Sequence, residues 1–205
     1  MVSPFRVCLT FDAEHPDRPT EPGVHEQVLA ILEREGIRAT FFVQGRWVEA
    51  YPHLARALPA HGHLVGSHSH YHARMPLLSA SGFATDVRRA ERVIRDIVKV
   101  DPAPWFRLPF GSGAGDARVH ASLDELGYRN VGWHADGREW RKRLRDHEVE
   151  DELTRATIAH GDGALVLMHT WARPVPPALE GLIPRLRDAG ATFMRVDEVG
   201  WGTVT

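Results

Sequence analysis

The sequence predicts an α/β fold built on a parallel sheet, and three observations support this. Short apolar segments alternate with longer amphipathic segments about seven times along the 205 residues. The short segments are apolar throughout, as expected for strands that are covered on both faces. No change in composition and no sequence repeat marks a domain boundary. We therefore expect right-handed crossovers between parallel strands, with the sheet closed into a barrel or left open.

Each element follows from its residue pattern. The strands are rich in β-branched and aromatic residues, and the helices carry apolar residues three and four positions apart. Pro52 predicts a break in the second helix because proline lacks a backbone N–H. In chain order we expect strand 5–11, helix 22–35, strand 37–43, helix 46–60, strand 63–65, helix 79–100, strand 105–107, helix 116–126, strand 128–133, helix 147–160, strand 164–168, helix 177–189 and strand 191–196.

Composition limits the kinds of partner. The chain is 43% hydrophobic and 25% charged, with a formal net charge of -2, so no general field attracts nucleic acid or an anionic membrane. We expect a single domain over residues 1–205. The sequence shows no signal segment and no apolar run long enough to insert into a membrane. This predicts a cytoplasmic protein, or an extracytoplasmic one if a leader has been trimmed.

Residues 66–72 hold three histidines. His68 and His72 are four positions apart, and on a helical turn two such side chains project from one face and can bind one metal ion. His70 would point to another face, and His61 and His63 are interpreted as structural or solvent-exposed. The alternative for the pair is ordinary histidines in a histidine-rich loop.

Polar residues follow several predicted strands. Asp12, His68, Arg107, Asp136 and His169 each lie just beyond the carboxyl end of a strand. In a parallel α/β barrel these ends open on one face, where active sites lie. The shared position indicates a common site more strongly than any one residue does.

The acidic loop after the first strand offers a base or a third ligand. Asp12 could complete a His–His–carboxylate metal site or act as general base on a metal-bound water. Glu14 and Asp17 are nearby competitors. The alternative is an aspartate that only orders a turn.

His169 is a candidate general acid or base, with a capping or core histidine as the alternative. Asp136 could hold its ring in one tautomer. Arg107 could pair with Asp12 or with Asp136 and favour the charged form of that carboxylate.

Aromatic residues occur in the same loops. Phe110, Trp140 and Trp171 suit the faces of sugar rings, which stack on aromatic side chains. Trp133 is interpreted as ordinary packing. The basic run 138–145 is interpreted as a solvated helix face, with a contact to an anionic polymer as the alternative.

Five short motifs, in order along nearly the whole chain, resemble those of the polysaccharide deacetylases, which are NodB-homology proteins of carbohydrate esterase family 4. The motifs are Thr10-Phe11-Asp12, His68-Ser69-His70-Tyr71-His72, Arg107-Leu108-Pro109-Phe110-Gly111, Asp136-Gly137-Arg138-Glu139-Trp140 and Leu167-Met168-His169.

The resemblance implies a distorted (β/α)7 barrel and a divalent metal, usually zinc. It implies hydrolysis of a carbon–nitrogen bond that is not a peptide bond, with removal of N-acetyl groups from an amino-sugar polymer such as peptidoglycan or chitin. The alternatives are another acylated substrate, such as an O-acetyl ester or a small amide, or a sugar-binding relative without catalysis.

The resemblance also implies residue roles. Asp12 matches the general base, and Arg107 matches the arginine that positions it. His68 and His72 match the metal-binding histidines. The backbone N–H of Phe110 matches an oxyanion donor.

The last two motifs supply the rest of the implied site. Asp136 and Trp140 match the motif that supports the catalytic groups and walls the pocket. Leu167 matches a pocket leucine, and His169 matches the general acid.

The sequence departs from the family pattern at two positions. Ala13 stands where the family has an aspartate that binds the metal, and alanine cannot do so. Glu14 is the expected third ligand, with Asp12 as the close alternative. Glu139 replaces an aspartate of the fourth motif.

Overall fold

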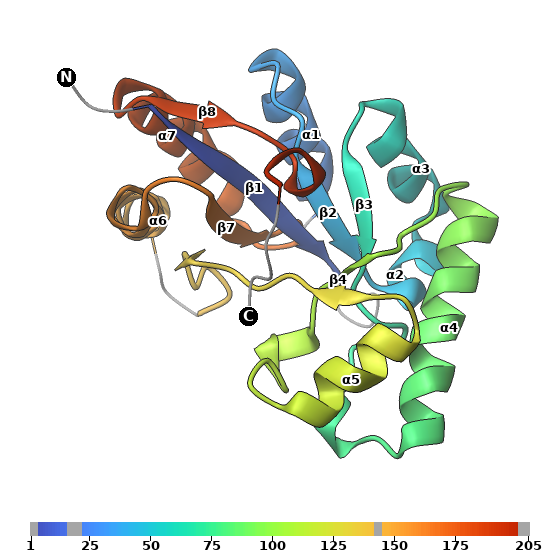
Figure 1. Ribbon diagram of the computed structural model, residues 1–205. Helices are drawn as coiled ribbons and strands as arrows, with labels where there is room; N and C mark the ends of the chain where they lie inside the picture. The colour runs from blue at the N-terminus through green and yellow to red at the C-terminus, as the bar shows by residue number, and fades with distance from the viewer. Residues whose placement is uncertain (1–3, 16–21, 142–144, 201–205) are drawn as a thin grey trace. The chain divides into compact units, whose positions relative to one another are not determined.

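The computed structural model describes residues 4–15, 22–141 and 145–200, which form two compact units. Among these residues, unit 1 consists of 4–11, 22–40, 133–141 and 145–200, and unit 2 consists of 12–15 and 41–132. Strand β1 (Phe5–Ala13) begins in unit 1 and ends in unit 2 (Figure 1). It is almost wholly buried, which agrees with its apolar sequence.

In unit 1, β1 lies between two other strands. One neighbour is β8 (Ala191–Phe193), which pairs with it in parallel. The other is β7 (Ala164–His169), which is buried along its whole length. The order continues to β6 (Ala135–Asp136), which also runs parallel to β7. This parallel order confirms the strand arrangement expected from the sequence.

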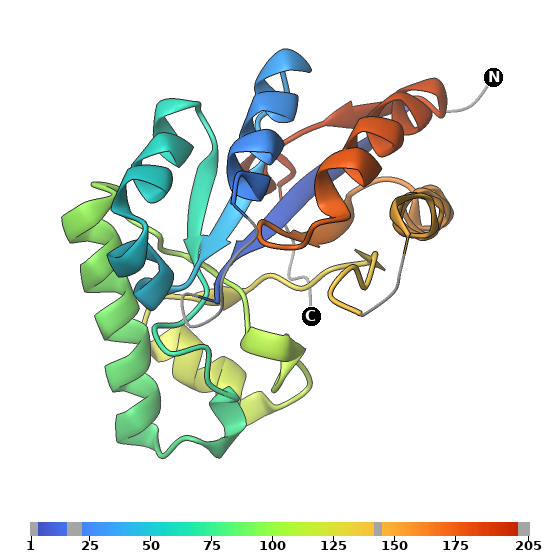
Figure 2. The same cartoon turned by 180° about the vertical axis from the view of Figure 1, so that it is seen from behind.

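Three helices pack in unit 1. Helix α7 (Val175–Asp188) contacts both α1 (Val24–Arg34) and α6 (Asp146–His160), and Figure 2 shows it between them. The buried side of α7 is apolar, with leucines and an isoleucine at helical spacing. Burial of this stripe fixes the position of the segment that connects β7 to α7.

In unit 2, the strand order runs from β5 (Arg129–Asn130) through β4 (Trp105–Phe106) and β3 (Leu64–Ser67) to β2 (Thr40–Val43) and the end of β1. Strand β4 pairs in parallel with both β3 and β5. The backbone N–H of Gln44 donates to the carbonyl of Ala13 at 2.9 Å. The carboxyl ends of β1, β2, β3 and β4 are therefore neighbours within this unit.

Helices cover unit 2, and α4 (Ala80–Ile97) packs along α2 (Gly45–Ala50) and α3 (Pro52–Ala60) (Figure 1). A core of phenylalanine, valine, leucine, methionine and tyrosine side chains joins α4 and α5 to β4. The helical segments of unit 2 are α2 (Gly45–Ala50), α3 (Pro52–Ala60), α4 (Ala80–Ile97), α5 (Ala117–Glu125) and the short 3₁₀ turns Met75–Leu77 and Pro109–Gly111.

The break predicted at Pro52 is confirmed, because α2 and α3 are separate helices on either side of Tyr51. The strand predicted over 128–133 is wrong in part. Only β5 forms there, because the carbonyls of Val131 and Gly132 accept hydrogen bonds from the guanidinium of Arg107. None of the helices in the described ranges has the length and apolar character needed to cross a membrane.

Candidate functional site

Three predicted metal ligands meet in unit 2. Glu14 follows β1, whereas His68 and His72 follow β3, and one ligand atom from each lies within 4.8 Å of the others. The Glu14 carboxylate contacts Nε2 of His72, and its Oε2 lies 3.3 Å from Nε2 of His68. Two ligands of a tetrahedral zinc ion are roughly 3.4 Å apart. The spacing and the two-imidazole, one-carboxylate donor set therefore fit a divalent metal such as zinc.

The histidine pair converges through a loop, so the expected helical turn is wrong. Ser69 and His72 both adopt left-handed backbone conformations, with φ of 62° and 57°. The Ser69 hydroxyl accepts a hydrogen bond from the His72 backbone N–H at 2.9 Å. Nδ1 of His68 lies 2.9 Å from the carbonyl of Arg107. Donation through Nδ1 directs Nε2 of His68 toward Glu14 as a ligand atom.

Asp86 on α4 anchors this loop and was not singled out from the sequence. Its two carboxylate oxygens accept hydrogen bonds from the backbone N–H groups of His70 and Tyr71, at 2.9 and 3.0 Å. Asp86 is 3% exposed and lies three positions after buried Phe83, on the apolar side of α4. A carboxylate on that side of an amphipathic helix is the signal that could have identified it.

Asp12 pairs with Arg107, one of the two partners that the sequence left open. Nη1 of Arg107 donates to Oδ1 of Asp12 at 2.9 Å, and the Arg107 guanidinium lies 4.2 Å from the ring centroid of Phe42. The other oxygen, Oδ2 of Asp12, lies 3.5 Å from Nε2 of His68. Asp12 thus has one oxygen held by a buried cation and the other beside the metal-ligand group.

Burial and charge act differently on the two histidines. Burial lowers the pKa of His68, but the carboxylates of Asp12 and Glu14 and the Arg107 carbonyl outweigh it, so the net pKa is raised. Burial lowers the pKa of His72 below its ordinary value, despite the contact with Glu14. A metal ion at Nε2 of His68 must therefore displace a proton that the site itself favours.

Phe110 borders the same group. Its backbone is left-handed, with φ of 60°, a conformation that costs a residue other than glycine roughly 1–3 kcal/mol. Its side chain is 55% exposed, and its ring centroid lies 4.3 Å from that of His72. The ring therefore forms an accessible apolar wall beside a predicted metal ligand.

Unit 1 contains the predicted acid, His169, at the end of β7. Oε1 of Glu139 lies 2.7 Å from Nδ1 of His169 and also accepts the His169 backbone N–H at 2.7 Å. Glu139 is 3% exposed. A buried carboxylate at Nδ1 fixes the tautomer that leaves Nε2 available for proton transfer.

This contact corrects the expectation that Asp136 orients His169. Asp136 instead accepts a hydrogen bond from the backbone N–H of Arg138 at 2.8 Å. Its partial burial raises its pKa above the usual range for an aspartate. Glu139 takes the orienting position because its carboxylate contacts both the ring and the backbone N–H of His169.

The other predicted residues of this part of the chain lie in unit 1. Leu167 is buried in β7 opposite Asp136 of β6. The ring centroid of Trp171 lies 5.3 Å from that of His169. Trp140 is 49% exposed. Among the earlier competitors for the metal, Asp17 lies outside the described residues.

The structure thus brings the predicted residues together in two sets. In unit 2 it joins the metal-ligand group to the Asp12–Arg107 pair and to Phe110. In unit 1 it joins His169 to Glu139 and Trp171. That both sets serve one substrate stays a prediction.

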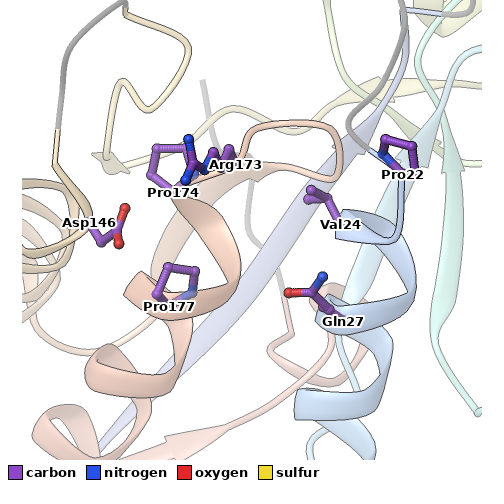
Figure 3. Close-up of a pocket in the computed structure, with 7 residues that line it drawn as sticks. All are labelled: Pro22, Val24, Gln27, Asp146, Arg173, Pro174 and Pro177. Carbon is purple, nitrogen blue, oxygen red and sulfur yellow. The ribbon is translucent and has the colours of Figure 1, made fainter.

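A hollow of about 430 Å³ also occurs in unit 1, at the first turns of α1, α6 and α7 (Figure 3). None of the predicted site residues lines it. Its walls are mostly proline and polar side chains, and it supplies no cluster of metal ligands. The lining residues are Pro22, Val24, Gln27, Asp146, Arg173, Pro174 and Pro177.

Comparison with known proteins defines the family. The family model described as polysaccharide deacetylase matches residues 2–131. The chain therefore belongs to the polysaccharide deacetylase family, as the five motifs suggested.

Two similar proteins act on peptidoglycan, according to their names. A peptidoglycan-N-acetylglucosamine deacetylase of Listeria monocytogenes is 30% identical over 194 residues, which are 95% of this chain but only 38% of that protein. A peptidoglycan-N-acetylmuramic acid deacetylase of Bacillus subtilis is 27% identical over 200 residues, covering 94% of this chain and 70% of the relative.

Solved structures confirm the fold class. A family 4 carbohydrate esterase of Streptomyces lividans, in complex with acetate, has a TM-score of 0.79 at 25% identity and covers 92% of this chain and 91% of its own. A family 4 pseudoenzyme from Bacillus anthracis has a TM-score of 0.85 at 25% identity, covering 97% and 66%. A mutant of that pseudoenzyme is described as having restored enzymatic activity. The fold is therefore shared by active and inactive proteins.

Proposed function

We propose that this protein is a metal-dependent hydrolase that removes N-acetyl groups from an amino-sugar polymer or oligomer of the peptidoglycan or chitin type. The observation that carries the proposal is the Glu14–His68–His72 group beside the Asp12–Arg107 pair. The names of the peptidoglycan-acting relatives support this substrate class.

Glu14, His68 and His72 would hold the metal. When bound there, a zinc or similar divalent ion would polarise the acetamide carbonyl and lower the pKa of a water ligand. Asp12 accepts the proton of the attacking water through the oxygen that Arg107 does not bind. Arg107 keeps the Asp12 carboxylate in one orientation.

The remaining steps use two further groups. The Phe110 backbone N–H donates a hydrogen bond to the oxyanion that forms on the carbonyl oxygen when water attacks the acetyl group. His169, held by Glu139, donates a proton to the departing sugar nitrogen. The C–N bond breaks, and the products are acetate and a free amino sugar.

A second candidate is a sugar-binding protein without catalysis. It is favoured by Ala13, which is fully buried where the family has a metal-binding aspartate, and by the similarity to a pseudoenzyme. Against it, Glu14 supplies a carboxylate to both histidines. Another acyl group, such as an O-acetyl ester, is the remaining alternative within hydrolysis.

The test combines a metal analysis with acetate release from chito-oligosaccharides, peptidoglycan and acetylated xylan. We expect bound zinc or a similar ion, and acetate from an N-acetylated glycan but not from xylan. His68→Ala should lose both metal and turnover, whereas His53→Ala, at an exposed position of α3, should keep both. Full activity of a metal-free His68→Ala protein contradicts the mechanism. Saccharide binding without metal or acetate release by the native protein identifies the non-catalytic alternative.

A further inference from the structure

Arg74 presents a cation at the edge of the candidate metal site. Its guanidinium carbon lies 4.6 Å from the ring centroid of Phe110, and that ring lies 4.3 Å from His72. Arg74 and Phe110 are both exposed. One aromatic ring therefore separates an accessible guanidinium from a predicted metal ligand, and all three side chains belong to unit 2.

The charge of Arg74 is not neutralised by the described part of the chain. Within residues 4–15, 22–141 and 145–200, no carboxylate forms an ion pair with it. Arg89 differs, because its guanidinium donates to the hydroxyl of Tyr71 and lies 3.9 Å from Glu49. The Phe110 ring restrains Arg74 by a cation–π contact, and a ring contact does not occupy the N–H donors at the edge of the guanidinium.

A planar guanidinium with free edge donors is suited to binding a carboxylate through two parallel hydrogen bonds. The two amino sugars of peptidoglycan differ in one such group. N-acetylmuramic acid carries a lactyl carboxylate on C3, next to the C2 carbon that bears the acetamide, whereas N-acetylglucosamine has a hydroxyl there. An acetamide directed at the metal ligands would thus bring the lactyl group within reach of a neighbouring cation.

We propose that Arg74 and Phe110 form a subsite for an anionic substituent on the amino sugar, namely the lactyl carboxylate of an N-acetylmuramic acid residue. This inference rests on the proposed function and specifies its substrate. The Phe110 ring offers its exposed edge to the apolar face of the sugar, and Arg74 distinguishes the two sugars by charge. The names of the relatives include both sugars, so family membership alone does not choose between them.

The experiment compares two matched glycans, a muramic acid-containing glycan and the same glycan with its lactyl carboxylates reduced to alcohols. Equilibrium binding and kcat/KM for acetate release are measured on both. The native protein should prefer the carboxylated glycan, and Arg74→Gln should reduce that preference by roughly 10- to 100-fold, the range expected for hydrogen bonds to a charged group. Arg74→Lys should retain part of the preference. Arg88→Gln, at an exposed position of α4, should retain all of it.

The two levels of the proposal fail separately. Equal binding and equal kcat/KM on the two glycans in the native protein overturn the proposed subsite. An unchanged preference for the carboxylated glycan in Arg74→Gln also overturns it. A protein that binds the carboxylated glycan preferentially through Arg74 but releases no acetate supports the subsite and overturns the proposed hydrolysis.

Discussion

At the scale of single residues, Glu14 is the centre of the candidate metal site. Its Oε2 faces His68 and His72, and its Oε1 lies 2.6 Å from Nε2 of His15. The backbone of His15 is left-handed, and its backbone N–H donates a hydrogen bond to Oε1 of Gln44 at 3.2 Å. The histidine therefore holds the Glu14 oxygen that does not face His68 and His72, which fixes the orientation of the carboxylate.

His15→Ala should weaken zinc binding by roughly 10- to 100-fold, the usual cost of losing a partner that orients a metal ligand. The physical reason is that Glu14 becomes free to rotate away from the ligand nitrogens. Competition with a chromophoric chelator measures the affinity without any need for turnover. His15→Gln, which keeps a donor near Glu14, should recover part of it. A zinc affinity equal to that of the native protein would show that His15 does not orient Glu14.

Glu139 should determine how well His169 acts as general acid. Because it contacts both the ring and the backbone of His169, Glu139→Gln should lower kcat more than Asp136→Asn does. The loss cannot exceed the roughly 10²- to 10⁴-fold that a general acid contributes, which His169→Ala would remove in full. The pH profile of kcat should also change in Glu139→Gln. A larger loss of kcat in Asp136→Asn than in Glu139→Gln would show that Asp136, and not Glu139, orients His169.

At the scale of elements, helix α4 supports the histidine loop through Asp86. The loop after β3 has no regular secondary structure, so its backbone N–H groups need partners from elsewhere. Asp86 supplies two acceptors from a buried position on α4. The spacing of the ligands therefore depends on the packing of a helix that contributes no ligand.

Asp86→Ala should lower the free energy of unfolding by roughly 1–3 kcal/mol, because a buried and a partly buried backbone N–H lose their acceptor. It should also weaken zinc binding, since the loop then has more freedom. Denaturant titration gives the first value and chelator competition the second. Asp96→Ala, at an exposed position of the same helix, is the matched control and should change neither. Unchanged zinc affinity in Asp86→Ala would show that the contact of Asp86 with the histidine loop does not affect metal binding.

Some helices, strands and site residues could be predicted from the sequence, and others could not. Long elements such as α4 and β7 were predicted because their apolar periodicity is local information. The strand predicted over 128–133 is shortened to β5, because hydrogen bonds from Arg107 to Val131 and Gly132 occupy carbonyls that a longer strand would use, and the short strand β6 was not predicted. The motif histidines were predicted, but through a helical turn that does not exist. The roles of His15 and Glu139 depend on distances between segments, which no local pattern encodes. Asp86 has a local signal, its carboxylate on the apolar side of α4, but its backbone partners in the histidine loop do not follow from that signal.

At the scale of the whole molecule, stability should depend on pH through His134. Nδ1 of His134 accepts a hydrogen bond from the Leu165 backbone N–H at 3.0 Å, and its ring stacks on His160 with centroids 3.6 Å apart. Burial, and then the charge of His160, lowers the pKa of His134 below its ordinary value. The folded state therefore resists a proton that the unfolded state accepts.

The direction of the pH effect on stability follows from the lower pKa of His134 in the folded state. Between the ordinary histidine pKa of about 6.5 and the lower folded value, the unfolded chain binds more protons, so stability falls as the pH is lowered through that window. His134→Asn keeps an acceptor for Leu165 but does not titrate. Comparing the loss of unfolding free energy between about pH 8 and about pH 5.5 in the two proteins cancels the contributions of the other histidines. The native protein should lose more stability than His134→Asn, and equal losses would assign the acid sensitivity to other groups.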